Sequence, residues 1–379
     1  NCANPLSKSS KTKTSSECLM RLAYISLHWP RTRNSGVGKK IQSQVKIWKD
    51  MGHETRLFMH TSKYESPSEL IEAEIFPYQI HGKFQTEMNR ILAIKQMIKA
   101  INDFKPNLIY LRYGIYVYSA HQLMQIGPVV EEINTNDLTQ HEGLGGIYNL
   151  YNRLTRGIFL RRVSGLVTVS QELAVSPAFA KYQKKTCVIA NGIELDSFST
   201  LPPASNAIPR LAFIGSPNNS WHGIDKIVKL ASLIPDIAID LIGYSQLPEY
   251  DPLPKNIQVH GYLSIEKYQN ILASADVAIS SLALHRVGLE EASPLKSREC
   301  LAFGLPLIIA YHDTDLNQED YDFLLKIPNK EDNIQTHTQA IREFAYRMKG
   351  QRVKQDQIKN LSQIAKEKIR IQFFEEILR

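Results

Sequence analysis

Strand-sized apolar runs alternate with helical stretches along most of the chain, and this alternation is the feature that most restricts its fold. In the first half, Ile41, Val45 and Trp48 recur at the spacing of a helix with one inward face. Strands are expected around that helix and after it, at residues 21–27, 56–59, 107–111, 128–132 and 166–169. Alternating strands and helices predict a parallel sheet covered on both faces.

The same alternation restarts after a Pro- and Ser-rich stretch at residues 197–209. Strands are expected at 211–214, 237–242, 277–280 and 306–310, with helices at 224–233, 265–273 and 295–303. We therefore expect an α/β protein with two doubly wound, Rossmann-like domains facing a cleft. The expected boundaries are 20–200, 201–355 and a charged C-terminal helix at 356–379. Ligands of such folds bind at the carboxyl ends of the strands.

Composition excludes several classes of protein. The chain has 379 residues, more than one hydrophobic core usually supports. Its composition, 43% hydrophobic and 22% charged residues, is typical of globular proteins. No apolar run approaches the ~20 residues that span a bilayer, so an integral membrane protein is not expected. The net charge of +7 is modest and no recognition motif accompanies it, so no nucleic-acid partner is expected.

The cysteines and the first residues bear on the compartment. Cys2, Cys18, Cys187 and Cys300 are scattered, which indicates neither a disulfide framework nor a zinc site. A reducing compartment, the cytoplasm, is expected. Residues 1–19 are rich in Ser, Lys and Thr and lack an apolar segment, so we expect a disordered tail or an expression remnant outside the fold.

The glycine-containing loop before the first helix is a candidate binding loop. Residues 35–40 read SGVGKK, which fails as a P-loop because Arg33 stands where the leading glycine is needed and Lys40 where Ser or Thr is needed. It also lacks the third glycine of a dinucleotide fingerprint. Exposed amides at a helix N-terminus favour a phosphate or sugar. A plain tight turn remains the alternative.

A stronger candidate lies at residues 290–306. Ser293 is a good N-cap and Pro294 suits the first helical position, so a helix is expected to start there and to end at Gly304. Glu291 then precedes the helix and Glu299 lies inside it. The free amides, the positive end of the helix dipole and the nearby Lys296 predict a diphosphate site flanked by carboxylates.

This segment carries a family resemblance. Glu291, seven residues, Glu299 and the following CLAFGLPLIIA resemble the Glu-seven-Glu motif of retaining glycosyltransferases of family 4, which have the GT-B fold. The segments GVGKKI, WKDMGHE, FKPNLIYLR, VTVSQEL, VIANGIELDSF, LAFIGS, WHGIDKIVKLA and VHGYLSIEKYQNILASADVAISSL are similar to that family in order and spacing. The resemblance covers about residues 20–379. It implies an acceptor-binding first domain, a nucleotide-sugar-binding second domain and a C-terminal helix that crosses back to the first.

The resemblance also implies roles for single residues. Glu299 would accept the ribose hydroxyls of the nucleotide, and Glu291 would orient the donor sugar. Gly36 and Val37 would let the backbone approach the diphosphate. The start of the helix would be presented to the same group by Ser293, Pro294, Leu295 and Lys296. In such retaining enzymes the leaving diphosphate oxygen helps to deprotonate the acceptor, so positioning and charge stabilisation are the protein's part and no metal is needed.

The chain departs from the family pattern at the residues that usually clasp the diphosphate. Ser216 and His222 stand where the family usually has Arg and Lys. Arg112 and Asn134 stand where many members have acceptor-domain histidines, so with Glu291 they are the candidate catalytic residues. Either Arg112 and Lys296 supply the missing charge, or donor binding is weakened, or catalysis has been lost.

Two further segments have competing interpretations. Asp313-Thr314-Asp315 matches the metal-binding DxD pair of the other large glycosyltransferase fold, but its position favours a chance match in a solvated loop. Residues 147–162 form a basic amphipathic stretch, with Arg153, Arg156, Arg161 and Arg162 among apolar residues. It is either an adsorbing surface for an anionic leaflet, worth about 1 kcal/mol per basic residue, or a core helix with a solvated basic face.

The sequence thus predicts a retaining, metal-independent hexosyltransferase-type enzyme. It would move a sugar from a UDP- or GDP-sugar to a hydroxyl of a glycan or lipid-linked acceptor in polysaccharide biosynthesis, in the cytoplasm or at the inner face of the membrane. Two alternatives stay open: a nucleotide-sugar-binding protein without transferase activity, and a nucleotide-sugar epimerase on the same fold.

Overall fold

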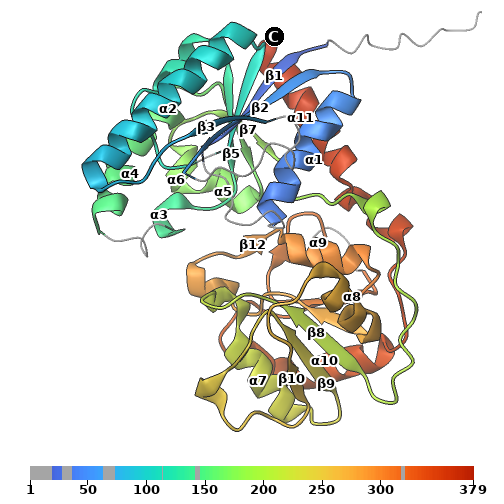
Figure 1. The fold of residues 1–379 in the computed structure, drawn as a ribbon. Coiled ribbons are helices and arrows are strands. Elements are labelled where there is room, and N and C mark those ends of the chain that lie inside the picture. The colour runs from blue at the N-terminus through green and yellow to red at the C-terminus, as the bar shows by residue number, and fades with distance from the viewer. Residues whose placement is uncertain (1–18, 28–35, 63–72, 113, 141–145, 317–320) are drawn as a thin grey trace, which may run out of the picture.

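The computed structural model describes residues 19–27, 36–62, 73–112, 114–140, 146–316 and 321–379. Two α/β units lie one above the other (Figure 1). The expected tail at 1–19 falls outside the described residues except for Leu19, and so does most of the loop that precedes the first helix.

The first unit is built on a seven-stranded parallel sheet in the order β3-β2-β1-β4-β5-β6-β7. Its strands are β1 (Arg21–Ser26), β2 (Glu54–Thr61), β3 (Ala73–Pro77), β4 (Leu108–Arg112), β5 (Val129–Ile133), β6 (Gly165–Thr168) and β7 (Lys185–Val188). Its helices are α1 (Gly36–Asp50), α2 (Lys83–Phe104), η2 (Ala120–Gln125), α3 (Asp137–Gln140), α4 (Gly146–Leu160), α5 (Gln171–Val175) and α6 (Pro177–Ala180). The edge strands β3 and β7 were not predicted, because half-exposed edges need no continuous apolar run.

The second unit holds a six-stranded parallel sheet in the order β10-β9-β8-β11-β13-β15. Its strands are β8 (Arg210–Ile214), β9 (Ala238–Ile242), β10 (Ile257–Val259), β11 (Val277–Ile279), β13 (Leu307–Ile309) and β15 (Leu324–Lys326), with a separate parallel pair β12 (Glu291–Ala292) and β14 (His312–Asp313). Its helices are η5 (Ser220–His222), α7 (Ile224–Leu233), η6 (Pro248–Tyr250), α8 (Ile265–Ser274), η7 (Leu284–Val287), α9 (Leu295–Ala302) and α10 (Asn333–Arg347). The sequence missed the short strands β10 and β15.

Alternate residues of the strands feed two cores on opposite faces of each sheet. In β4, Ile109 and Leu111 join the core beneath α2 and α4, whereas Leu108 and Tyr110 join the core beneath α1. The second sheet is covered in the same way on both faces. Burial on both faces explains why the central strands are nearly continuous apolar runs, and the predicted two-domain parallel α/β fold class is confirmed.

Two segments of chain run between the units side by side. They contain η4 (Leu195–Ser197) and η8 (Gln355–Leu361), and the backbone of Ile193 bonds to both Leu361 and Gln363 at 2.9 and 2.8 Å. The second segment leads into α11 (Gln363–Leu378), which packs against α1 of the first unit. There the Trp48 indole donates to Glu367 at 2.8 Å and its ring lies edge-on to Phe374.

None of the described helices combines the length and apolarity needed to cross a lipid bilayer.

Candidate functional site

A cavity of about 220 Å³ lies between the two units, at the carboxyl ends of strands from both sheets. The first unit supplies residues that follow β5 and β6, and the second supplies residues from the ends of β8 and β11 and from the start of α9. The cavity brings together the predicted site residues Asn134, His222, Glu291, Ser293, Pro294 and Lys296. Gly36, Val37, Arg112, Ser216, Leu295 and Glu299 are not among its lining residues.

Gly36 and Leu295 nevertheless meet at the junction of the two units. A Cβ atom on Gly36 would come within 3.0 Å of Leu295 Cδ1, so the first residue of α1 lies against the first residue of α9. A side chain at position 36 would require the Leu295 side chain to shift by a few tenths of an ångström. The glycine predicted as an approach for a diphosphate is therefore also a contact between the units.

The start of α9 differs from the predicted cap by one residue. Pro294, in extended conformation, is the N-cap and no side chain caps the helix. Ser293 does not cap because its Oγ accepts from the Asn191 amide at 2.9 Å and from Arg298 Nη2 at 3.0 Å. The amides of Leu295 and Lys296 consequently lack an intrahelical acceptor, which leaves positive partial charge at this end of the helix, beside the cavity.

Lys296 adds a full positive charge to the cavity wall. Burial lowers the pKa of its ammonium group, while Glu299 one turn along the helix opposes that change. Among the residues that the structure describes, Lys296 is the one lysine or arginine that lines the cavity. An anionic group bound there would stabilise the charged lysine.

Glu291 is held by the other unit. It lies in β12, and its Oε2 accepts from the backbone amide of Glu172 in α5 at 2.8 Å. In return, Oε2 of Glu172 accepts from the amides of Glu290 and Glu291 at 3.0 and 2.8 Å. The two carboxylates thus exchange backbone hydrogen bonds between the units, and Glu291 is fixed at the cavity wall.

Glu299 lies inside α9 and accepts a hydrogen bond from the Tyr268 hydroxyl of α8. Burial and the neighbouring carboxylate raise the pKa of Tyr268 well above its ordinary range, so the phenol keeps its proton. The Tyr268 phenol is an O–H donor to the Glu299 carboxylate, and a ribose hydroxyl is also an O–H donor.

Ser216 and His222 are linked through Tyr244. The Tyr244 hydroxyl donates to the Ser216 carbonyl at 2.8 Å and lies 2.9 Å from His222 Nδ1. Since a tyrosine has one hydroxyl hydrogen, Nδ1 of His222 is the donor in that second bond. Burial and the charge of Lys296 lower the pKa of His222 to about 4. At neutral pH the ring carries no positive charge, and its Nε2 is an acceptor.

Arg112 and Asn134 both contact the buried ion pair of Lys40 and Glu132: Arg112 binds Glu132, and Asn134 binds Lys40. Lys40 Nζ lies 2.7 Å from Glu132 Oε1, and Arg112 Nη1 lies 3.2 Å from Glu132 Oε2. The Lys40 ammonium also donates to Asn134 Oδ1 at 3.1 Å and to Asn191 Oδ1 at 2.8 Å. Arg112 is therefore engaged by Glu132, and Lys40 orients the two asparagines that line the cavity.

Burial lowers the pKa of Lys40 to about 8, against the pull of Glu132. Burial raises the pKa of the Glu132 carboxyl. The positive charges of Lys40 and Arg112 lower it by more, so the pKa lies below its usual range. The pair stays charged at neutral pH.

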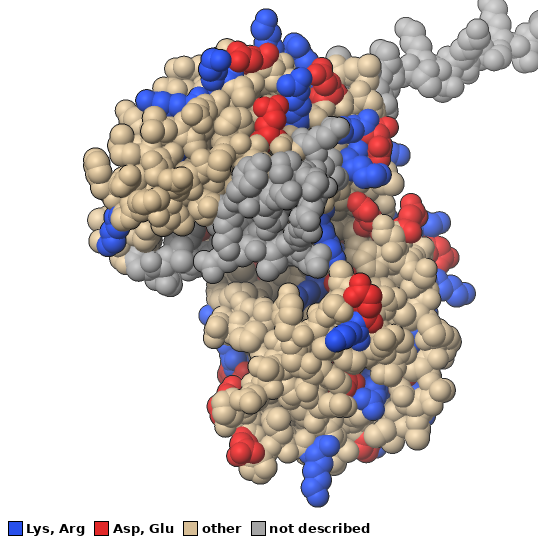
Figure 2. All heavy atoms as spheres, in the orientation of Figure 1, with Lys and Arg blue, Asp and Glu red and all other residues tan. Residues whose placement is uncertain are grey.

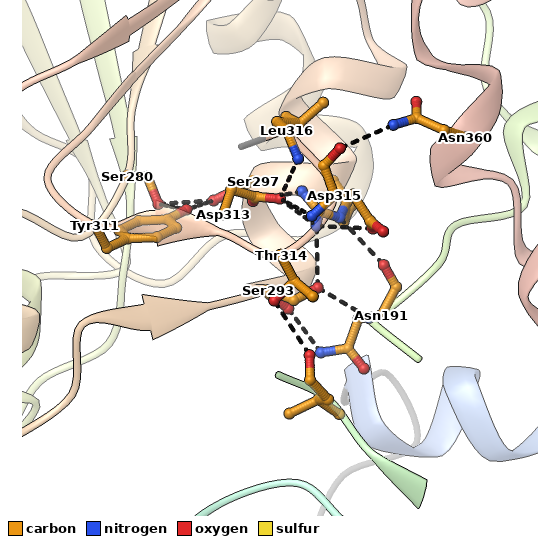
Figure 3. A network of polar contacts seen from close by, with 12 residues as sticks. Asn191, Ser280, Ser293, Ser297, Tyr311, Asp313, Thr314, Asp315, Leu316 and Asn360 are labelled. Atoms are coloured by element: carbon orange, nitrogen blue, oxygen red, sulfur yellow. Dashed lines mark hydrogen bonds and ion pairs between the residues drawn. The ribbon is translucent and has the colours of Figure 1, made fainter. Parts of the chain in front are cut away.

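The prediction that Asp313-Thr314-Asp315 lies in a solvated loop is wrong, because Asp313 is buried. Asp313 is fully buried and forms a double hydrogen bond with Arg298, at 2.7 and 2.8 Å. Arg298 also donates to the Asn191 carbonyl at 3.1 Å, and Asp315 contacts Arg298 and Lys366. Figure 3 shows this network, with Asn191 and Ser293 on one side and Asp315 and Asn360 on the other. The aspartates tie α9 to the segments that join the two units.

The described residues contain no group of three or more His, Cys, Asp or Glu side chains placed to hold a metal ion. Asp313 is occupied by a guanidinium, which agrees with the interpretation of the DxD sequence as a chance match.

Sequence reasoning missed Lys40, Glu172 and Asn191. Lys40 and Gln44 are both buried and lie one turn apart in α1, and Trp48 follows one turn later on the same face. A lysine on the inward side of a helix is a signal for a buried acidic partner. Glu172 and Asn191 give no such signal, because their partners are more than 100 residues away in the sequence.

Comparison with known proteins finds a family model for part of the chain and solved structures with the same fold. Residues 35–197 match the family model of Glycosyltransferase Family 4. No curated protein sequence matches the chain. Among solved structures, a glycosyltransferase from Rickettsia africae is 15% identical with a TM-score of 0.64, covering 95% of this chain and 99% of that one.

Two other structures have the same fold. HepE of Anabaena in complex with UDP-glucose is 14% identical with a TM-score of 0.58, over 94% of this chain and 99% of its own. Sucrose-phosphate synthase from Thermosynechococcus elongatus is 14% identical with a TM-score of 0.60, over 94% and 96%. The predicted resemblance is confirmed: the chain carries a glycosyltransferase family domain and has the GT-B fold.

Proposed function

From a glycosyltransferase family 4 domain on a GT-B fold, we propose that this enzyme is a retaining hexosyltransferase. It takes a nucleoside diphosphate sugar, a UDP- or GDP-sugar, and transfers the sugar to a hydroxyl of a glycan or lipid-linked acceptor in polysaccharide biosynthesis. The observation that carries the proposal is the cavity between the units, which joins the uncapped start of α9, Lys296 and Glu291 at the carboxyl ends of both sheets.

The roles of the residues follow from their chemistry. The diphosphate binds at the amides of Leu295 and Lys296 and at the Lys296 ammonium, because these groups offer hydrogen bonds and positive charge together. Glu299 exchanges the Tyr268 hydroxyl for ribose hydroxyls. Glu291, fixed by Glu172, orients the donor sugar. HepE, a structural neighbour, is described in complex with UDP-glucose, which supports a uridine nucleotide.

We assign the transfer itself to positioning and to charge stabilisation of the leaving diphosphate, whose oxygen takes the acceptor proton on the same face of the sugar. Lys296 and the helix end supply the stabilising charge, so the proposed reaction needs no metal ion. Arg112 keeps Glu132 ionised beside Lys40, and Lys40 orients Asn134 toward its place in the cavity wall. The unpaired thiols Cys187 and Cys300 fit the proposed cytoplasmic location.

A binding protein without transferase activity is the second candidate, since neutral His222 and Ser216 provide no cationic clasp. An epimerase would convert the nucleotide sugar without any acceptor.

The test is a thermal-shift panel of UDP-, GDP-, ADP- and dTDP-sugars with Glu299→Ala as the control. Ligand binding to the folded state raises the unfolding temperature, so one nucleotide should give a rise of several degrees that Glu299→Ala loses. Turnover is then measured with and without acceptor. Absence of a shift with every nucleotide would refute the donor site, and binding without acceptor-dependent consumption would favour the binding protein.

A further inference from the structure

We propose that α2 and α4 form a docking face that places the first unit on an anionic lipid bilayer, with a headgroup phosphate in a basic pocket beside α4. This docking face consists of the apolar side chains that α2 and α4 expose and of the pocket residues defined below. The proposal goes beyond the donor site, and only its link to a lipid-linked acceptor rests on the proposed function.

Each helix exposes a stripe of large apolar side chains. On α2, Phe84, Met88 and Leu92 recur every four residues, and Phe84 is 82% exposed. On α4, Ile147 and Leu154 lie two turns apart and are 77% and 73% exposed. Both helices already bury their other faces in the core of the first unit, so these stripes are additional to what the fold needs.

The two stripes belong to the same side of the first unit. Ile91 of α2 and Tyr151 and Ile158 of α4 pack against one core cluster. Figure 1 shows α2 and α4 on one flank of the upper unit, and Figure 2 shows mostly uncharged atoms over that flank.

A basic pocket of about 420 Å³ adjoins the α4 stripe. It is lined by Arg153, Leu154, Gly157, Ile158, Arg161, Lys181 and Tyr182. Gly157 forms its floor, since a Cβ atom there would lie 3.5 Å from both Arg161 Cζ and Tyr182 Oη. The pocket thus presents guanidinium, ammonium and phenol groups around a floor without a side chain, a donor set suited to a phosphate.

The charge of this region has one sign. Residues 146–162 contain four arginines and no acidic residue, and residues 177–185 contain three lysines and no acidic residue. Three nearby acidic groups are paired: Glu87 with Arg90 and buried Asp137 with Arg156, each at 2.7 Å, and Glu376 with Lys185 at 2.8 Å, so Lys185 is left out of the docking face. Arg156 is thus a core residue, whereas Arg153, Arg161 and Arg162 are exposed.

Exposed apolar side chains next to a basic pocket match the two layers of an anionic leaflet, its headgroups and the acyl boundary below them. Residues 147–162 therefore fit both interpretations given by the sequence, a core helix and a membrane-adsorbing surface. One face of α4 is core, and the face that carries Ile147 and Leu154 is the adsorbing surface.

The experiment is sedimentation of the purified protein with vesicles of phosphatidylcholine alone or with phosphatidylglycerol. We expect the wild type to bind only the anionic vesicles. Arg161→Gln/Lys181→Gln should weaken the partition coefficient about twenty-five-fold, since each basic residue contributes about fivefold. Phe84→Ser/Ile147→Ser should weaken it at least tenfold.

Matched controls lie on the second unit, at exposed positions. Lys255→Gln/Lys267→Gln and Leu233→Ser change the same chemistry and should leave binding unchanged. Equal binding to neutral vesicles, equal loss in the controls, or no binding of the wild type to either vesicle would overturn the proposal. The last outcome would favour a protein partner.

The nucleotide thermal shift is measured on the same samples. A docking variant that keeps its shift and loses sedimentation is folded and supports the docking face. A wild type that sediments but gives no shift with any nucleotide refutes the proposed donor site and leaves the docking face standing.

Discussion

Glu172 and Glu291, 119 residues apart in the sequence, each accept the other's backbone amide between the two units of the enzyme. The relationship resembles a capping box in which the two partners come from different domains. Glu291 lines the cavity, and its orientation there depends on Glu172, a residue of the first unit. Relative movement of the units would release this carboxylate.

Glu172→Ala keeps the backbone amide that binds Glu291 but removes the carboxylate that holds the amides of Glu290 and Glu291, and so it frees the backbone of β12 that carries Glu291. We expect it to lower turnover more than it lowers donor affinity. Hydrogen bonds to a charged group contribute about 1.5–3 kcal/mol, so we expect a roughly tenfold or greater loss in kcat with KM for the donor changed about threefold or less. Glu172→Gln keeps an acceptor and should lose less. Steady-state kinetics on both variants checks this, with Glu343→Ala on α10 as an exposed control. Equal losses of kcat and donor affinity would contradict the positioning role.

The Lys40–Glu132 pair should be strongly coupled. Removing one partner of a buried pair costs about 3–5 kcal/mol when the remaining charge has no other counter-charge. Glu132 keeps Arg112 when Lys40 is removed, so we expect a loss near the lower end, about 3 kcal/mol. We expect Lys40→Met to destabilise the protein by about that amount and Lys40→Met/Glu132→Gln to recover part of the loss. Urea denaturation of both single variants and the double variant measures the coupling. Additive free energies of unfolding would refute it.

Glu131 should make stability depend on pH. Its carboxyl is fully buried in β5, both oxygens lack a hydrogen-bond partner among the described residues, and burial raises its pKa from 4.5 to about 8. Between these values the folded protein keeps a proton that the unfolded chain has released, so Glu131 makes stability fall as pH rises, and the loss is complete above about pH 8.

Glu131→Gln cannot ionise and should remove this loss. We expect it to be more stable than the wild type, with a difference that grows from pH 5 to pH 8 and reaches a few kcal/mol. Thermal unfolding across this range is the measurement, with exposed Glu343→Gln as the control. A difference that stays constant with pH would contradict the assignment.

Arg298 should be irreplaceable by lysine. Its guanidinium donates hydrogen bonds to Asp313, to the Ser293 hydroxyl and to the Asn191 carbonyl at the same time. A lysine ammonium lacks the planar fork of donors needed to bind all three. Arg298→Lys should lower the free energy of unfolding by about 3 kcal/mol. Arg342→Lys, in a half-exposed pair with Asp236, should cost less than about 1 kcal/mol. Chemical denaturation compares the two, and similar costs would show that the network adds little.

Patterns that can be read along the amino-acid sequence were enough to predict the parallel α/β class and to propose a candidate site. Apolar periodicity is a local property, so helices such as α7 (Ile224–Leu233) could be predicted to the residue and the central strands within a residue or two. Glu291 and Lys296 could be proposed as site residues because a helix start signalled by Ser293-Pro294 is also a local pattern, although Ser293 does not cap the helix.

Tertiary structure decided the rest. Lys40, Glu172 and Asn191 acquire their roles from partners in other elements, and Asp313 is buried only because Arg298 lies opposite it. Whether a charged side chain is solvated or buried depends on which charge faces it across the fold, since an isolated charge cannot leave water without a partner. That pairing is set by how α1, α9 and α11 pack, and no single segment of the sequence contains it.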